Sequence, residues 1–197
     1  MAQEIECKIM GMTLQQFLDL AREKRLEFVF QRAVEVTDVY WENTDGEVIR
    51  CRHGCSKLDS SVGKFMVANE YIDLTVKGCE ENDGNKISER EEIVLPQVKS
   101  LKEVNAFLSR IGFHINRTLL KERNVFIDAN DQSPIRIHHD KFFLSGDYEG
   151  PAVEWVEVEA DTKGYLYEFL FQMGIEWEDI SNKSTLDIIN EYSAHQE

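Results

Sequence analysis

The sequence predicts an α+β fold in which an eight-stranded antiparallel β-barrel closes into a tunnel and helices pack on its outside. Eight segments have strand character, and breakers such as Asp45-Gly46 and Gly150-Pro151 separate them. Consecutive strands with short connections favour antiparallel pairing, and eight strands are enough for a sheet to close around a lumen. The predicted strands are 3–9, 28–41, 47–54, 64–78, 86–95, 114–128, 134–144 and 152–160.

Four helices are predicted between and after these strands. A Thr or Ser followed three residues later by Gln or Glu marks helix starts at Thr13 and Ser100, and apolar residues at helical spacing follow each. A third helix covers 165–173 and ends at Gly174, and a short fourth helix begins at Ser184. The apolar faces of the strands are expected to lie under these helices.

The chain is expected to form one domain over 1–197. Its length lies at the upper end of one ordinary domain, and no linker divides it. The N-terminus has no signal-peptide pattern, and no segment approaches the run of about 18 apolar residues that spans a bilayer. We therefore expect a cytoplasmic protein without a membrane partner.

Cysteine usage predicts reduced thiols. The four cysteines show no paired spacing of the kind found in small secreted proteins. Cys51, His53 and Cys55 could suggest zinc, but a structural zinc site needs four ligands and no second Cys or His pair follows.

Charged residues alternate with apolar residues along the predicted strands. Residues i and i+2 of a strand share a face, so Glu4, Glu6 and Lys8 lie together and the apolar residues of 3–9 lie opposite. Charged residues share a face in the same way in six further strands. These residues are Arg50, Arg52, Asp73, Lys77, Arg90, Glu92, Lys121, Arg123, Arg136, His138, Asp140, Glu157 and Glu159.

Two interpretations of these faces compete. For a single strand, a solvated surface is the more frequent meaning of charge alternation. Seven strands whose polar faces carry mainly Arg, Lys, Glu and Asp favour a lumen instead. The formal net charge of −15 argues against a nucleic-acid partner, so any bound anion should be small and enclosed. A polyphosphate bound together with magnesium or manganese would neutralise both sets of charges.

The motifs resemble those of the CYTH superfamily, also called triphosphate tunnel metalloenzymes. Glu4-Ile-Glu6-Cys-Lys8 is similar to the ExExK signature of that family, and the resemblance covers the whole chain in order. The other matching segments are Asp38-Val-Tyr40, Ile49-Arg50-Cys-Arg52, Leu74-Thr-Val-Lys77-Gly78, Arg90-Glu-Glu92, Lys121-Glu-Arg123, Val156-Glu157-Val-Glu159 and Asn182-Lys183-Ser184-Thr-Leu186. The segment after Asp140 is longer than the family pattern, which leaves Asp147 or Glu154 as alternatives for its role.

The resemblance implies roles for the charged residues. Carboxylates are expected to hold one or two magnesium or manganese ions, and basic residues are expected to bind the phosphates. The implied metal ligands are Glu4, Glu6, Glu157 and Glu159, with Glu92 and Asp140 as further ligands or water-positioning groups. The implied phosphate-binding residues are Lys8, Arg50, Arg52, Lys77, Lys121, Arg123 and Lys183, assisted by Arg90 and Arg136. Without a ligand, the crowded cations are expected to repel one another.

Three functions are compatible with this resemblance. Hydrolysis of tripolyphosphate or of a nucleoside or thiamine triphosphate is favoured, by metal and Arg/Lys stabilisation of the transferring phosphoryl group, with Glu4, Glu6, Lys8, Asp140, Glu157 and Glu159 as its catalytic set. The alternatives are an adenylyl cyclase that releases pyrophosphate, and a sensor that binds nucleotide without turnover. The chain is expected to be a monomer or a homodimer. Trp155 is in phase with Glu157 and is a candidate stacking platform, although a core position is favoured.

Overall fold

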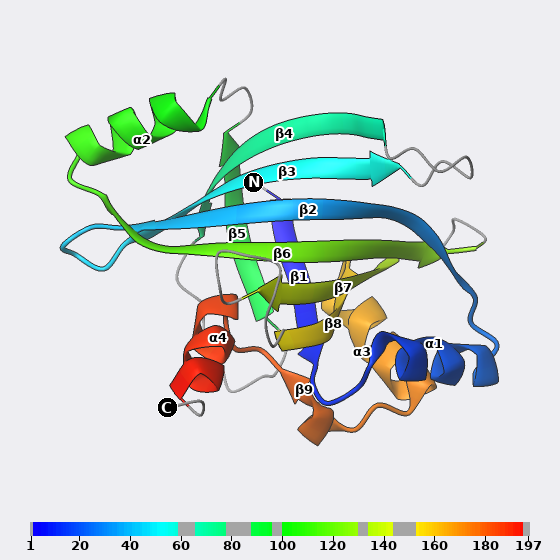
Figure 1. Ribbon diagram of the computed structural model, residues 1–197. Helices are drawn as coiled ribbons and strands as arrows, with labels where there is room; N and C mark the ends of the chain where they lie inside the picture. The colour runs from blue at the N-terminus through cyan, green and yellow to red at the C-terminus, as the bar shows by residue number, and fades with distance from the viewer. Residues whose placement is uncertain are drawn as a thin grey trace.

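The computed structural model describes residues 2–58, 66–77, 88–95, 100–129, 134–143 and 153–194. They form one antiparallel sheet with four α-helices, so the α+β class predicted from the sequence is confirmed. Figure 1 shows the long strands β2, β3, β4 and β6 running side by side, with β1 and β5 crossing behind them and β7 and β8 below β6. The elements, in chain order, are β1 Ala2–Ile9, α1 Leu14–Glu23, β2 Phe28–Glu42, β3 Val48–Leu58, β4 Met66–Lys77, β5 Ser88–Leu95, α2 Leu101–Arg110, β6 His114–Asp128, β7 Ile135–Phe143, β8 Val153–Ala160, α3 Lys163–Met173, the 3-10 helix Trp177–Asp179, β9 Ile180–Ser181 and α4 Thr185–Ala194.

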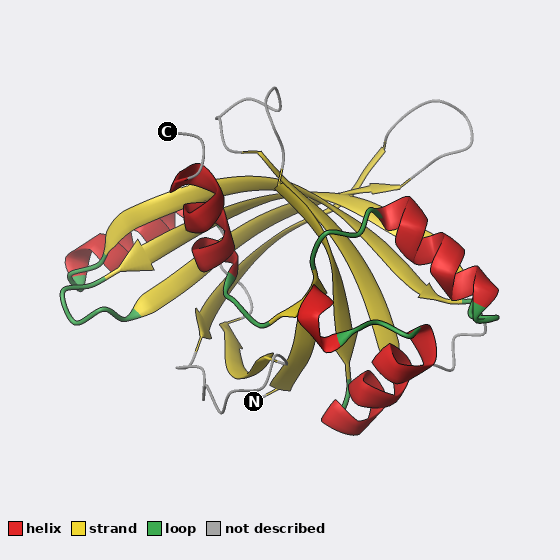
Figure 2. Ribbon diagram, turned by 90° about the horizontal axis from the view of Figure 1, so that it is seen from below, coloured by secondary structure: helices red, strands yellow, loops and turns green. Residues whose placement is uncertain are grey.

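The strands follow the order β5-β4-β3-β2-β6-β7-β8-β1-β9, and their registers are antiparallel. In addition, β1 pairs with β5, the strand at the other end of this order, over Ala2–Glu6 and Ser88–Glu92. Figure 2 shows how strongly the sheet curves. The curvature turns one face of the sheet inward, where side chains from several strands can meet.

Local sequence explains where the elements begin and end. Thr13 closes the predicted capping box with Gln16, and the Ser100 hydroxyl accepts a hydrogen bond from the Glu103 amide. Gly174 ends α3 in the left-handed conformation, at φ 70°, as a glycine can without steric cost. Turn and cap chemistry thus fixes the boundaries that the sequence predicts.

The two faces of the sheet differ in chemistry. We call the side that carries the alternating charges the charged face. It bears Glu6, Lys8, Asp38, Arg50, Arg52, Lys121, Arg123, His138, Asp140, Glu157 and Glu159. The opposite, apolar face is covered by α1 and α3 over β1, β7 and β8, and by α2 over β2, β3 and β4. Figure 1 shows α1 and α3 side by side, as the shared core requires.

The fourth helix does not follow the prediction that helices pack on the outside. Ile188 and Ile189 of α4 pack against Tyr40, Phe142 and Trp155, which are in phase with the charged residues of their strands. Thus α4 covers one end of the charged face. The physical reason is that this end carries large apolar side chains, and a helix with its own apolar residues buries them.

No helix within the described ranges combines the length and the apolar character needed to cross a membrane.

Candidate functional site

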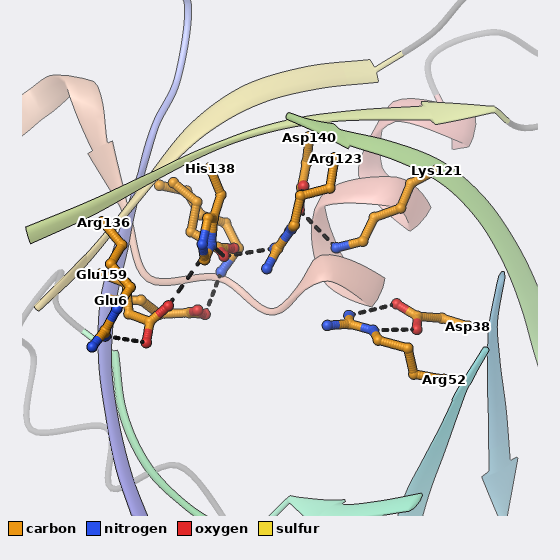
Figure 3. A network of polar contacts seen from close by, with 11 residues as sticks. Glu6, Asp38, Arg52, Lys121, Arg123, Arg136, His138, Asp140 and Glu159 are labelled. Carbon is orange, nitrogen blue, oxygen red and sulfur yellow. Dashed lines mark hydrogen bonds and ion pairs between the residues drawn. The ribbon is translucent and has the colours of Figure 1, made fainter. Parts of the chain in front are cut away.

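The charged side chains meet because their strands place them opposite one another. Arg123 of β6 is in register with Asp140 of β7, and Glu157 of β8 is in register with His138 of β7 and with Lys8 of β1. Directly opposed residues of an antiparallel pair lie on the same face with Cβ atoms about 5 Å apart. The result is the buried network of acids and bases in Figure 3.

Asp140 is the centre of this network. Its Oδ2 accepts hydrogen bonds from Lys121 Nζ at 2.7 Å and from Arg123 Nη2 at 2.6 Å, and its Oδ1 accepts one from Arg123 Nε at 2.6 Å. Burial alone would raise the pKa of Asp140, but the charges of Arg123 and Lys121 outweigh burial and lower the pKa to about 2. Asp140 is therefore an ionised carboxylate that orients two cations.

Asp38 and Arg52 form a second buried pair, across β2 and β3. Arg52 Nε donates to Asp38 Oδ1 at 2.7 Å, and Arg52 Nη2 donates to Oδ2 at 2.8 Å. Burial alone would raise the pKa of Asp38, but Arg52 holds it well below its usual range. The predicted list of site residues omitted Asp38. The Asp-x-Tyr segment was the sequence signal that could have identified Asp38. In the structure, Asp38 pairs in register with Arg52.

Glu157 links three strands. Its Oε1 accepts a hydrogen bond from Arg123 Nη2 at 2.7 Å and lies 3.3 Å from His138 Nδ1. Burial alone would raise the pKa of Glu157, but Arg123, His138 and Lys8 lower it well below its usual range. His138 also lies 3.8 Å from a carboxylate oxygen of Glu159. His138 therefore belongs to the same network as Glu157 and Glu159.

The cations of the charged face that the structure describes do not form the mutually repelling wall expected from the sequence. Lys8 donates to Glu6 Oε1 at 3.1 Å, and Arg50 donates to Thr75 Oγ1 at 3.3 Å. Arg52, Lys121 and Arg123 each contact a carboxylate. Acidic residues of neighbouring strands are in register with Arg52 and Arg123 and separate the cations, although burial and the charges of Arg123 and Arg52 still lower the pKa of Lys121.

Loss of Arg52 is therefore expected to destabilise the protein. Arg52→Ala leaves the buried Asp38 carboxylate without its bidentate partner, which should lower the free energy of unfolding by about 2 kcal/mol. Urea denaturation at pH 7 measures this change. Arg22→Ala is the matched control, because its pair with Asp19 is exposed and should contribute less than about 0.5 kcal/mol. Equal effects of the two substitutions would contradict a buried Arg52–Asp38 pair.

Two predicted phosphate-binding residues are exposed, one apart from the network and one at its edge. Lys183 is exposed and donates to both carboxylate oxygens of Glu191 in α4, at 2.6 and 2.7 Å. Arg136 is also exposed, and it contacts Glu159 at 3.1 Å and Asp161 at 3.4 Å. The structure therefore places Arg136 at the edge of the charged face and Lys183 against α4.

Other predicted residues are placed only by backbone register. The side chains of Glu4, Lys77, Arg90 and Glu92 lie outside the described set, but Glu4 is opposite Arg90 and Lys77 is opposite Glu92. Among the alternatives to Asp140, Asp147 lies outside the described residues. Glu154 is on the opposite face, where its carboxylate lies 3.3 Å from His139 Nε2, so it cannot take the place of Asp140.

The donor set of the charged face suits a hard divalent cation. Glu6 and Glu159 are opposed in register, and Glu157 lies two residues from Glu159, so three carboxylates come from two adjacent strands. Carboxylate oxygens are the ligands that magnesium and manganese prefer. Within the described residues, no group of three His, Cys, Asp or Glu side chains is arranged to hold a metal ion. Cys51, His53 and Cys55 therefore do not form such a group either. A cation at the glutamates would therefore replace Arg123, His138 and Lys8 as partners of the carboxylates.

Trp155 is part of the core at the α4 end of the charged face. Its side chain is fully buried, and it stacks on Phe142 with ring centroids 4.5 Å apart. The favoured interpretation of the sequence, a core position, agrees with this burial. An exposed platform at a tunnel entrance does not.

Comparisons with known proteins show likeness at the level of structure. No protein-family model and no curated protein sequence matches the chain. The PH1819 protein of Pyrococcus horikoshii OT3 superposes with a TM-score of 0.67 at 22% identity, covering 96% of this chain and 99% of that one. A candidate adenylate cyclase from Vibrio parahaemolyticus gives 0.59 at 15% identity, covering 96% and 99%. The RNA triphosphatase domain of the mimivirus mRNA capping enzyme gives 0.50 at 14% identity, covering 88% of each chain.

Proposed function

We propose that the chain is a metal-dependent triphosphatase of the CYTH superfamily, whose substrate binds inside a closed β-tunnel. Its likeness in fold to the PH1819 protein, the Vibrio parahaemolyticus protein and the mimivirus RNA triphosphatase domain supports this proposal. The observation that carries the proposal is the convergence of Arg52, Lys121 and Arg123 with buried carboxylates on one face of the sheet. The pairing of β1 with β5 supports a closed tunnel. On a solvated sheet face these side chains would stay exposed to water. Their burial in pairs is what an enclosed site requires, because burying a charge without a partner is costly.

The basic residues would bind the phosphate chain. Arg guanidinium groups match phosphate oxygens in bidentate geometry, as Arg52 and Arg123 already do with Asp38 and Asp140. Phosphate oxygens would thus take over hydrogen bonds that the carboxylates accept in the ligand-free protein. The buried carboxylates keep Arg52 and Arg123 oriented until the substrate arrives, which lowers the reorganisation needed during the reaction.

Glu6, Glu157 and Glu159 would hold magnesium or manganese, together with Glu4 and Glu92 if their side chains reach the same face. A bound cation of this kind neutralises charge on the phosphates and lowers the pKa of a bound water. The protein's own contribution is positioning and electrostatic stabilisation of the phosphoryl group, so no covalent nucleophile is required.

A cyclase is the second candidate, and the likeness to the Vibrio parahaemolyticus protein favours it. Both reactions would use the same phosphate-binding residues, so the products decide between them. The test incubates the purified protein with magnesium or manganese and, separately, tripolyphosphate, ATP or thiamine triphosphate, and then separates the products. Orthophosphate supports the triphosphatase. Pyrophosphate with cyclic AMP from ATP would replace it by the cyclase, and binding without any product would support the nucleotide sensor.

The affinity for tripolyphosphate should depend on pH through Lys121. Burial, followed by the charge of Arg123, lowers the pKa of Lys121 to about 8. A bound phosphate favours the charged ammonium, so binding raises this pKa and takes up a proton. As the pH rises from 7 to 9, the wild type should lose about tenfold in affinity relative to Lys121→Arg, which stays charged.

Isothermal titration calorimetry of both proteins at pH 7, 8 and 9 measures this difference. The ratio of the two affinities cancels the ionisation of tripolyphosphate itself, which affects both proteins equally. A ratio that stays constant with pH would show that Lys121 does not change its protonation when the ligand binds.

A further inference from the structure

The indole N–H of Trp155 has a position that the proposed reaction does not yet use. Trp155 lies on the charged face, two residues before Glu157 on β8 and opposite Asp140 on β7. Its side chain is fully buried, and within the described part of the chain its Nε1 has no hydrogen-bond partner. An indole N–H can only donate, so this atom needs an acceptor.

The carboxylate in register with Trp155 already serves other donors. The nearest carboxylate in register, Asp140, accepts three hydrogen bonds from Lys121 and Arg123. A buried donor without a partner costs free energy, and a ligand that supplies the acceptor recovers that cost. Lys121, Arg123 and the Trp155 indole are all donors, so the ligand group that suits them together is an anion with several oxygens.

Packing holds the indole and the ammonium group of Lys121 at the same end of the charged face. Phe142 stacks on Trp155 with an interplanar angle of 25°, and Lys121 Nζ lies 5.2 Å from the centre of the Phe142 ring. On its other side the cluster is closed by Ile188 and Ile189 of α4. A phosphate group that contacts Lys121 would therefore lie at the same end of the charged face as Trp155, with Phe142 on the strand between them.

We propose that Trp155 is a substrate-binding residue whose Nε1 donates a hydrogen bond to an oxygen of the phosphate group at the α4 end of the bound triphosphate. This proposal rests on the proposed triphosphate-binding function. It adds a neutral donor to the charged groups, and it fixes how far the phosphate chain extends toward α4. Because the donor is neutral, it selects for an oxygen at that position without adding to the crowded positive charge.

The sequence provides a matched control for this proposal. Trp41 is also buried, and its Nε1 also has no hydrogen-bond partner within the described residues, but Trp41 packs under α2 on the apolar face. Trp155→Phe and Trp41→Phe both remove an indole N–H and keep an aromatic ring. Trp155→Phe should weaken tripolyphosphate binding about tenfold by calorimetry, because a hydrogen bond to a charged acceptor is lost. Trp41→Phe should leave the affinity unchanged.

A second measurement uses the wild-type protein and does not depend on the folding of a variant. Labelling with 15N-tryptophan gives indole N–H signals for Trp41, Trp155 and Trp177, which the Phe variants assign. Adding tripolyphosphate should move the Trp155 indole proton downfield, as expected for a new hydrogen bond to an anion, and should leave Trp41 in place.

Each outcome decides the proposal. If wild type binds tripolyphosphate while the Trp155 signal stays in place and Trp155→Phe keeps its affinity, Trp155 has a packing role only. A Trp155 signal that is already downfield without ligand, and does not move, would show that water is its acceptor, which also overturns the proposal. If wild type binds none of tripolyphosphate, ATP and thiamine triphosphate, the proposed function itself fails.

Discussion

Hydrolysis of tripolyphosphate is expected to fall to the uncatalysed rate in EDTA and to return when magnesium or manganese is added in excess. Glu6, Glu157 and Glu159 offer only oxygen ligands, and a divalent cation held there would offset the negative charge of the phosphates beside these carboxylates. Orthophosphate release, followed with and without chelator, measures the effect. Turnover that is undiminished in EDTA would contradict the metal role.

The same experiment separates catalysis from binding. Arg52, Lys121 and Arg123 remain in place when the metal is removed, so tripolyphosphate should still raise the melting temperature in EDTA. Loss of turnover together with retained binding would assign the metal to the chemical step. Loss of both would show that the phosphates bind through the metal.

Much of the fold could be predicted because each strand alternates regularly. The predicted range 114–128 coincides with β6, and 28–41 differs from β2 by one residue at its end. Turn residues and caps are local signals, so they predict where a strand or helix ends without knowledge of the rest of the fold. The face on which a charged residue lies follows from its position within the strand alone.

Pairing across strands could not be read from the alternation. That Asp38 faces Arg52 and that Asp140 faces Arg123 depends on register, which the strand termini and bulges set. For this reason the sequence predicted a continuous cationic wall where carboxylates stand between the cations. Alternation, in contrast, already decides that Glu154 points away from the site, because it lies three residues from Glu157 on the same strand.

The position of α4 also could not be predicted from the sequence. Tyr40, Phe142 and Trp155 interrupt the charges on their strands, and this was the available sign that one end of the charged face is apolar. An amphipathic helix can cover an apolar patch on either face of a sheet. The periodicity of its sequence does not show which face it covers. The contact of Lys183 with this helix could not be foreseen either, because its partner Glu191 lies on the helix.

Asp140→Asn is expected to lower the free energy of unfolding by about 3 kcal/mol at pH 7 and to abolish most of the turnover. The substitution keeps the volume of the side chain but removes the negative charge that Lys121 and Arg123 share. Lys121 is 2% exposed, so its charge would remain buried without compensation, and breaking a buried pair in this way costs several kcal/mol. Urea denaturation measures the change.

The control for this prediction is Asp161→Asn. Asp161 is 57% exposed and lies 3.4 Å from Arg136, so its loss should change the free energy of unfolding by less than about 0.5 kcal/mol. The acid dependence adds an independent check. The pKa of Asp140 is lowered from 3.8 to about 2, so its contribution to stability is complete above the unfolded value and is lost as the pH falls through that range. The Asn variant should lack this part of the acid dependence.

Tripolyphosphate should restore part of the stability that Asp140→Asn removes. Tripolyphosphate supplies the anion that Asp140→Asn removes, so it should raise the melting temperature of the variant at least as much as that of wild type, if the substrate sits against Lys121 and Arg123. Thermal unfolding with and without tripolyphosphate, in EDTA to prevent turnover, measures both shifts. A destabilised variant that gains nothing from tripolyphosphate would show that this buried cluster is structural and that the phosphates bind elsewhere on the charged face.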